Sequence, residues 1–370
     1  MATAAITGTV GDGATEAEIV AGAGTIVITL TNDTWVESTT INTFYVDPTA
    51  TGTNDGSSPT NAFTTLDYCM DVRALANADL VNSNTIERWI CSSAGGAHTA
   101  DTTALGLLAF TTGPNNYIEI TCSESHGGVW NTGMYRIEVA NAPPVLVQNN
   151  YVRIDGLQIY KTASDGSGEA SILINTIAAG GSDIRISNCI LRQPGNASFN
   201  EQCLYVADAD ATVNCWNTIM YGVGAAVSTS NAAVLQNGGV LNIAHCTLIG
   251  GYTGFRVTAG TANAYNCYAY GSGVAYSNAG TQNQTKCAAN DTTATDATLD
   301  SILKDTSTGA GHAGFTNVTA GSEDFTIKTG SALIGVGADL SGESAPMNVS
   351  TDIDGAARTI ATPDIGADEL

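Results

Sequence analysis

The chain has few charged residues, and few of those are basic. Only 13% of its 370 residues are Asp, Glu, Lys or Arg, well below the roughly 25% of an ordinary soluble domain. Helical bundles cover their surfaces with such residues, so the composition argues against that class. The 35 acidic and 12 basic residues give a net charge of −23. Because this charge repels phosphates and anionic lipids, we expect neither nucleic acid nor anionic membranes as partners.

Several common sequence signals are missing. No long apolar run is present, so no membrane-spanning helix is expected. Residues 1–7 have neither the basic region nor the apolar core of a secretory leader, and we expect a protein that does not use that export route. Nucleotide-binding glycine motifs, the GxSxG nucleophile motif and CxxC pairs are absent, and the histidines are scattered. The corresponding nucleotide-binding, hydrolase and zinc-site classes are therefore not expected.

The nine cysteines lie mostly within apolar runs. An odd number means that at least one cannot pair within the chain. A buried thiol behaves as a small hydrophobic group. We therefore expect these cysteines to be reduced core residues of a protein made in a cytosol.

Gly, Ala, Thr, Ser and Asn replace the missing charges, and this mix favours β-structure with tight turns. Five similar segments begin at Val152, Ile184, Val213, Leu241 and Ala262. Their fifth positions are Gly156, Asn188, Asn217, His245 and Asn266, and their sixth positions are Leu157, Cys189, Thr218, Cys246 and Cys267. Spacings of roughly 20 to 30 residues indicate stacked repeats.

These repeats predict a single-stranded parallel β-helix. Alternate residues of each strand point inward, and like residues stack on like because successive coils pair in parallel. Asn at a coil corner tolerates the left-handed conformation of a tight bend. Stacked Asn side chains can hydrogen-bond along the column. We expect the sixth-position column of small residues to fill a narrow interior.

Two stretches resemble the ends of a bacterial and phage family of right-handed parallel β-helix proteins. The first contains Phe44-Tyr45-Val46-Asp47-Pro48, Gly52-Thr53-Asn54-Asp55-Gly56 and Ala62-Phe63-Thr64-Thr65-Leu66. The second contains Ser331-Ala332-Leu333-Ile334-Gly335-Val336-Gly337, Asp352-Ile353-Asp354-Gly355, Arg358 and Asp364-Ile365-Gly366-Ala367-Asp368-Glu369. The resemblance implies a right-handed parallel β-helix. It says little about function, because the family includes lyase-like proteins, adhesins and virion proteins.

The segment at residues 6–36 is similar to a short β-module of phage tail and other virion proteins. It contains Ile6-Thr7-Gly8, Thr15-Glu16-Ala17-Glu18-Ile19-Val20-Ala21-Gly22 and Thr25-Ile26-Val27-Ile28-Thr29-Leu30-Thr31-Asn32-Asp33-Thr34-Trp35. The resemblance implies that residues 1–40 attach the chain to other virion proteins or to copies of itself, as in a homo-oligomer such as a trimer.

The sequence also predicts how the chain is divided. Residues 63–80 have apolar side chains at helical spacing, and we expect this helix to cap the open end of the solenoid. The expected parts are an N-terminal β-module at 1–40, a cap at 41–85, the parallel β-helix at 86–285, and C-terminal coils with a cap at 286–370. The fold class is therefore all-β with one helical cap.

Few residues suggest a catalytic role. A β-helix lyase needs a basic residue beside carboxylates that bind Ca²⁺, and the nearest such set is Arg185, Arg192, Asp183, Asp208 and Asp210. A glycosidase needs two carboxylates across a groove, and Asp208 and Asp210 are expected to share one face of a strand. Outward, solvated charges explain the same residues.

Oxygen ligands for Ca²⁺ are offered by Asp47 with Asp55, and by Asp352 with Asp354, although turn formation also explains these residues. No cofactor is required by any motif. Exposed tyrosines that could stack on sugars are Tyr265, Tyr268, Tyr270 and Tyr276, although packing between protomers or flat against the coil equally explains them.

Taken together, these features predict a virion structural protein, such as a capsid decoration, a head fibre or a tail-associated spike. Its β-helix would project from the particle and could bind cell-surface glycans. The expected location is the virion, assembled in the host cytoplasm. The alternatives are a polysaccharide lyase or depolymerase, and a secreted, extracellular adhesin that needs an export signal.

Overall fold

The computed structural model describes residues 39–93, 99–163, 170–195, 200–224, 230–303 and 313–370. These residues belong, apart from Thr39, to one compact unit, Thr40–Leu370. The predicted N-terminal β-module at 1–40 lies almost wholly outside the described residues. Within the described part of the chain, no helix is long and apolar enough to cross a membrane.

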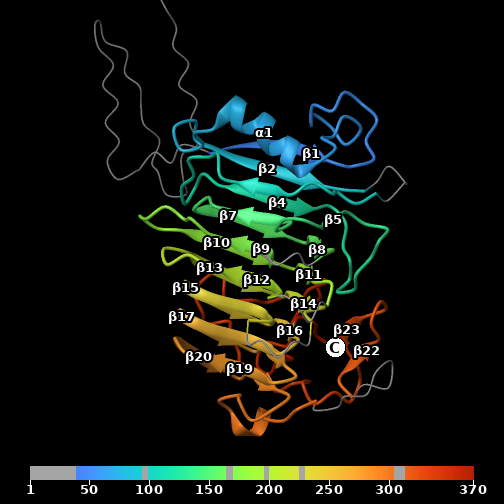
Figure 1. The fold of residues 1–370 in the computed structure, drawn as a ribbon, viewed down its shortest axis with the longest axis vertical. Coiled ribbons are helices and arrows are strands. Elements are labelled where there is room, and N and C mark those ends of the chain that lie inside the picture. The colour runs from blue at the N-terminus through green and yellow to red at the C-terminus, as the bar shows by residue number, and fades with distance from the viewer. Residues whose placement is uncertain (1–38, 94–98, 164–169, 196–199, 225–229, 304–312) are drawn as a thin grey trace, which may run out of the picture. The chain divides into compact units, whose positions relative to one another are not determined.

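The unit is a parallel β-helix with three walls, stacked coil on coil (Figure 1). Wall 1 consists of β1 (Thr40–Val46), β2 (Thr85–Cys91), β4 (Ile118–Cys122), β7 (Tyr151–Asp155), β10 (Asp183–Ser187), β13 (Thr212–Trp216), the second halves of β15 (Ala232–Ala244) and β17 (Thr253–Tyr265), and β20 (Thr281–Thr285). Wall 2 consists of β3 (Leu105–Leu107), β6 (Val145–Val147), β9 (Ala170–Ile174), β12 (Gln202–Val206), the first halves of β15 and β17, and β19 (Val274–Asn278).

Wall 3 is a separate parallel sheet on the remaining side of each coil. It consists of β5 (Arg136–Val139), β8 (Gln158–Lys161), β11 (Ile190–Arg192), β14 (Ile219–Tyr221), β16 (Thr247–Ile249), β18 (Tyr268–Tyr270) and β21 (Ala288–Ala289). Strands β15 and β17 run through the bend between walls 2 and 1 without a break, so those two walls form one 14-stranded sheet. The predicted all-β parallel β-helix is confirmed.

The predicted cap helix is present as α1 (Leu66–Asn77). It begins after Thr65, whose hydroxyl accepts a hydrogen bond from the Tyr68 amide, as expected of an N-cap residue. Its residues Leu66 and Cys69 are buried, and Figure 1 shows the helix above β1 and β2 at the N-terminal end of the stack. The helix thereby covers apolar side chains that an open solenoid would expose.

The five repeated segments lie in register, as their alignment requires. Ile184 pairs with Val152 and Val213, and Leu241 continues the column to Ala262. The residues at the fifth position all have positive φ, namely Gly156, Asn188, Asn217, His245 and Asn266. This corner column separates wall 1 from wall 3, because each strand of wall 3 starts two residues later.

The stack extends one coil further than the repeat recognised in the sequence. Gln282 pairs with Ala262, and Lys286 occupies the corner with a φ of 51°. Cys287, which follows it, is fully buried like Cys267. Gln282 and Gln284 occupy positions where earlier coils have apolar residues. Because of this replacement, the hydrophobic pattern of the sequence did not reveal the last coil.

All nine cysteines are free, and eight are buried. Cys189, Cys246, Cys267 and Cys287 form one interior column with Leu157 and Thr218, and all six are fully buried. The Sγ atoms of Cys215 and Cys246 lie 4.0 Å apart. The structure therefore uses the thiols as small core groups.

The C-terminal residues return along the side of the stack. An antiparallel pair, β22 (Phe315–Asn317) and β23 (Asp324–Ile327), packs Phe315 and Phe325 against wall 3, including Ile190, Ile219 and Tyr268. Figure 1 shows this pair, in orange to red, beside β14 and β16. Later residues follow the corner column, where the amide of Ala338 donates to Asn266 Oδ1 and Asn217 Nδ2 donates to the Thr351 carbonyl.

Candidate functional site

Two of the candidate catalytic residues form a local ion pair on the outer face of wall 1. Arg185 Nη2 lies 2.6 Å from Asp183 Oδ2, both on β10. The other oxygen of Asp183 accepts a hydrogen bond from Asn214 on the next coil. Each side chain is about a quarter exposed. Both groups are therefore engaged by neighbours on the same wall.

Asp208 and Asp210 lie in the turn between β12 and β13, not on a strand. The expectation that they share one strand face is wrong, because β12 ends at Val206. Asp208 Oδ1 accepts from the Asp210 amide and Oδ2 from the Ile177 amide of the preceding coil. The carboxylate of Asp208 therefore closes its own turn and ties it to the coil above.

The fifth candidate, Arg192, lies elsewhere, at the end of β11 on the outer face of wall 3. Its guanidinium carbon is 4.7 Å from the ring centre of Tyr160, 5.6 Å from that of Tyr221 and 5.7 Å from that of Trp130. The structure thus divides the five residues among wall 1, a turn and wall 3. We name the group Trp130, Tyr160, Arg192, Tyr221 and Glu323 the Arg192 cluster.

The polar atoms of the Arg192 cluster are poorly satisfied. Arg192 Nη2 lies 4.0 Å from Glu323 Oε2, beyond hydrogen-bond distance. Among the described residues, Arg192 Nε and the Tyr221 hydroxyl are buried with no hydrogen-bond partner. Burial of Tyr221, a residue that is 3% exposed, raises the pKa of its hydroxyl. Buried polar groups in this state usually have a water molecule or a ligand as partner.

The first pair of predicted Ca²⁺ ligands is divided between two turns. Asp47 Oδ1 accepts from the amide and hydroxyl of Thr49. Asp55 accepts from the Ser57 amide and the Thr53 hydroxyl. These bonds are those of Asx turns, which explain both residues without a cation.

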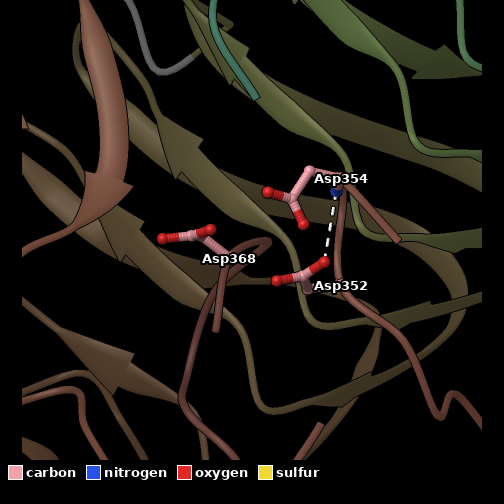
Figure 2. A group of neighbouring side chains, drawn as sticks. All are labelled: Asp352, Asp354 and Asp368. Atoms are coloured by element: carbon pink, nitrogen blue, oxygen red, sulfur yellow. Dashed lines mark hydrogen bonds between the residues drawn. The ribbon is translucent and has the colours of Figure 1, made fainter. Parts of the chain in front are cut away.

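The second predicted pair, Asp352 and Asp354, meets a third carboxylate, that of Asp368 (Figure 2). One oxygen atom from each of the three lies within 4.8 Å of the other two. Burial and the neighbouring Asp354 raise the pKa of Asp352 to about 6. Burial, followed by the charges of Asp352 and Asp354, raises the pKa of Asp368 to about 6 as well.

Oxygen ligands of this kind suit Ca²⁺ chemically. The same oxygens also accept backbone hydrogen bonds, since Asp352 Oδ1 takes the Ala356 amide, Asp352 Oδ2 the Glu369 amide, and Asp368 Oδ2 the Ile327 amide. These bonds join three parts of the C-terminal segment. The cluster therefore has a structural explanation, and the three carboxylates are also the residues that would hold a cation there.

The corner residues form part of a hydrogen-bonded column. Asn217 Nδ2 donates to Asn188 Oδ1 over 3.1 Å, and Asn266 Nδ2 lies 3.1 Å from His245 Nε2. A second column was missed in the sequence. Its members are Asn214, Asn242, Asn263 and Asn283, and each of the last three donates to the one before it over 2.9 Å. Its signal was the Asn at the second position of consecutive repeats, which points outward from wall 1.

The tyrosines proposed for sugar stacking differ in exposure. Tyr268 and Tyr276 are 1% and 4% exposed, so the expectation that they offer ring faces to solvent is wrong. Tyr268 packs against Phe315, and Tyr276 donates its hydroxyl hydrogen to the Cys267 carbonyl. The C-terminal pair of strands covers Tyr268, whereas Tyr276 lies in the interior core of the coils beside Phe255, and neither contact is visible in the local sequence.

Comparison with known proteins gives little further identification. No protein-family model and no curated protein sequence matches the chain. One solved structure, described as the crystal structure of pectate lyase Pel9A, is similar over 89% of this chain and 96% of that chain, with 12% sequence identity and a TM-score of 0.34. The assignment of the parallel β-helix rests on the strand pairing of this chain.

Proposed function

We propose that this chain is a structural, non-catalytic protein of a bacteriophage particle, which displays its β-helix on the particle surface. The resemblance of residues 6–36 to virion modules supports the phage origin. Residues 1–40 would bind other virion proteins or further copies of this chain, in a homo-oligomer such as a trimer. The particle component would be a capsid decoration, a head fibre or a tail-associated spike.

The structural role is supported by the hydrogen bonds and ion pairs that polar side chains form with neighbouring coils. Asp183, Arg185 and Asp208 bind neighbouring groups of the same or the adjacent coil. The Asn column on wall 1 continues the same pattern over four coils. A general base must exchange protons with a substrate in reach. Side chains that bind one another along the stack stabilise the scaffold instead.

The catalytic alternative is tested with purified full-length protein and a panel of neutral and acidic polysaccharides. Reducing ends and ultraviolet-absorbing unsaturated products are measured over a range of pH, with and without Ca²⁺. We expect no product. Formation of product by the wild type, and its loss in a variant with Arg192→Lys and Asp208→Asn, would overturn the non-catalytic role.

The virion role is tested by placing an epitope tag at the C-terminus of the chain in its native genome and purifying the particles. We expect the tagged chain to co-sediment with particles and to be labelled on their surface by antibody under the electron microscope. Particles that lack the chain, while it accumulates free in the lysate, would contradict this role.

A further inference from the structure

We propose that the Arg192 cluster on the outer face of wall 3 binds a neutral saccharide. This inference goes beyond the structural role and does not depend on which particle carries the chain. It rests on unsatisfied polar atoms, on the arrangement of rings around them, and on the charge of the protein.

The first observation is that Arg192 and Glu323 face each other without forming a hydrogen bond. Among the described residues, Arg192 Nε and the Tyr221 hydroxyl are buried without a hydrogen-bond partner, and Arg192 Nη2 stops 4.0 Å from Glu323 Oε2. The two side chains are 21% and 13% exposed, so solvent reaches both only in part. A half-buried charge without hydrogen bonds is costly. Buried polar groups without a protein partner are usually hydrogen-bonded to water or to a ligand, and ligand hydroxyls can replace such a water.

The second observation is the ring arrangement. Trp130 and Tyr160 are half-buried and meet edge to face, with ring centres 5.8 Å apart. Their rings, together with Tyr221, surround the guanidinium within the range of cation–π contact. The arrangement orients the planar donor fork of Arg192 and leaves partly exposed ring surface beside it. Such rings present apolar surface to the C–H face of a sugar.

The third observation is that the cluster is held in place by structure from three parts of the chain. The loop that carries Trp130 is fixed to β8, since the Asn131 amide donates to Gln158 Oε1 over 2.6 Å and Gln158 Nε2 donates to the Asn131 carbonyl. Val129 forms a β-bridge with Asp324, next to Glu323. Preorganised side chains lose little entropy when a ligand binds.

The chemistry of the cluster selects a neutral sugar. Vicinal hydroxyls both donate and accept, so one sugar can accept from Arg192 and donate to Glu323. A carboxylated sugar would be repelled by the Glu323 carboxylate and by the field of a protein with a net charge of −23. A cationic ligand would be repelled by the Arg192 guanidinium. The neutral polyol is therefore the class for which both charged groups are favourable.

The test uses full-length protein and four neutral probes, namely cellotetraose, maltotetraose, mannotetraose and chitotetraose, with trigalacturonate as the acidic comparison. Binding is measured by saturation-transfer NMR and by titration of tryptophan fluorescence. We expect at least one neutral probe to bind with a Kd of about 1 mM or tighter. The variants are Arg192→Lys and Glu323→Gln, with Arg185→Lys as the matched control on wall 1. Thermal unfolding of each variant is measured to check that it remains folded.

We expect Arg192→Lys, which keeps the charge but loses the fork, to weaken binding about tenfold or more. Arg185→Lys should leave the Kd unchanged. Trp130→Phe should abolish the ligand-dependent change in fluorescence while a saturation-transfer signal persists. Absence of binding by all four neutral probes, preference for trigalacturonate, or equal binding by Arg192→Lys would each overturn the proposal.

Discussion

Arg358 Nη2 donates a hydrogen bond to Asn217 Oδ1 over 3.1 Å, joining the C-terminal segment to a coil corner 141 residues earlier in the chain. Arg358 is 5% exposed. Its guanidinium also donates to the carbonyls of Thr351, Gly366, Ala367 and Asp368 and to the Glu369 carboxylate. One buried side chain thus holds the returning segment together and attaches it to the solenoid.

Replacing Arg358 with Met should therefore be strongly destabilising. The variant keeps much of the side-chain volume but leaves several buried acceptors and the Glu369 carboxylate without a partner. We expect a loss of about 3–5 kcal/mol in the free energy of unfolding, as for a broken buried ion pair. Urea unfolding measures it, and limited proteolysis reports release of residues 351–370. Arg185→Met, in a partly exposed pair, should cost about 1 kcal/mol or less. Equal effects of the two substitutions would contradict this role of Arg358.

The last coil offers a test of the left-handed corner. Lys286 has a φ of 51°, and its ammonium group lies 2.7 Å from Asp296 Oδ2. Both Lys286→Gly and Lys286→Ala lose that ion pair, so their difference isolates the backbone. Because only Gly adopts positive φ without a steric cost, we expect the Gly variant to be more stable by about 1 kcal/mol in urea unfolding. A more stable Ala variant would show that the corner conformation is not retained at this coil.

The carboxylate cluster of Asp352, Asp354 and Asp368 predicts a contribution to the free energy of unfolding that falls as pH rises. The pKa values of Asp352 and Asp368 are raised to about 6, above the usual value near 4. The folded chain therefore holds protons that the unfolded chain releases, and this contribution is present below about pH 4 and lost as pH rises through about 6. Asp354→Asn should raise the melting temperature above pH 6, because it removes a neighbouring charge. Near pH 4 it should not raise it, because there the Asp354 carboxylate accepts a hydrogen bond from Asp352, which lowers the pKa of Asp354.

The control for the carboxylate cluster is Asp210→Asn, which removes an exposed carboxylate outside it. This substitution should leave the shape of the pH profile unchanged. A melting temperature for Asp354→Asn that is raised equally at all pH values would show that repulsion within the cluster is not the cause.

His245 predicts the opposite pH dependence. Burial, with the nearby charge of Arg358, holds the pKa of His245 well below its usual value near 6.5. The folded imidazole stays neutral while the unfolded one takes up a proton, so stability is lost as pH falls below about 6.5. His245→Asn should reduce this loss, since Asn tolerates the corner φ of 49° and can hydrogen-bond to Asn266. The melting temperature of each protein is measured at pH 7 and at pH 5. If His245→Asn loses as much between these pH values as the wild type does, the prediction is contradicted.

The sequence by itself determined the fold and the corners of the coils. In parallel coils the same position recurs at the same place, so Asn188, Asn217 and Asn266 could be aligned from residue type alone. The cap helix was also predictable, because its spacing and its N-cap, Thr65, are local features. The sequence proposed Asp352 and Asp354 as a pair for the same reason, since they are neighbours in the chain.

Only the tertiary structure decided where the returning C-terminal segment lies and what it brings together. Asp368 joins Asp352 and Asp354, and Glu323 joins Arg192 and Trp130, through contacts between distant parts of the chain. The C-terminal residues have no repeat, so no periodicity relates them to the wall that they cover. Packing of Phe315 and Phe325 on wall 3 sets their position, and such long-range burial is not encoded in the spacing of residues along the sequence.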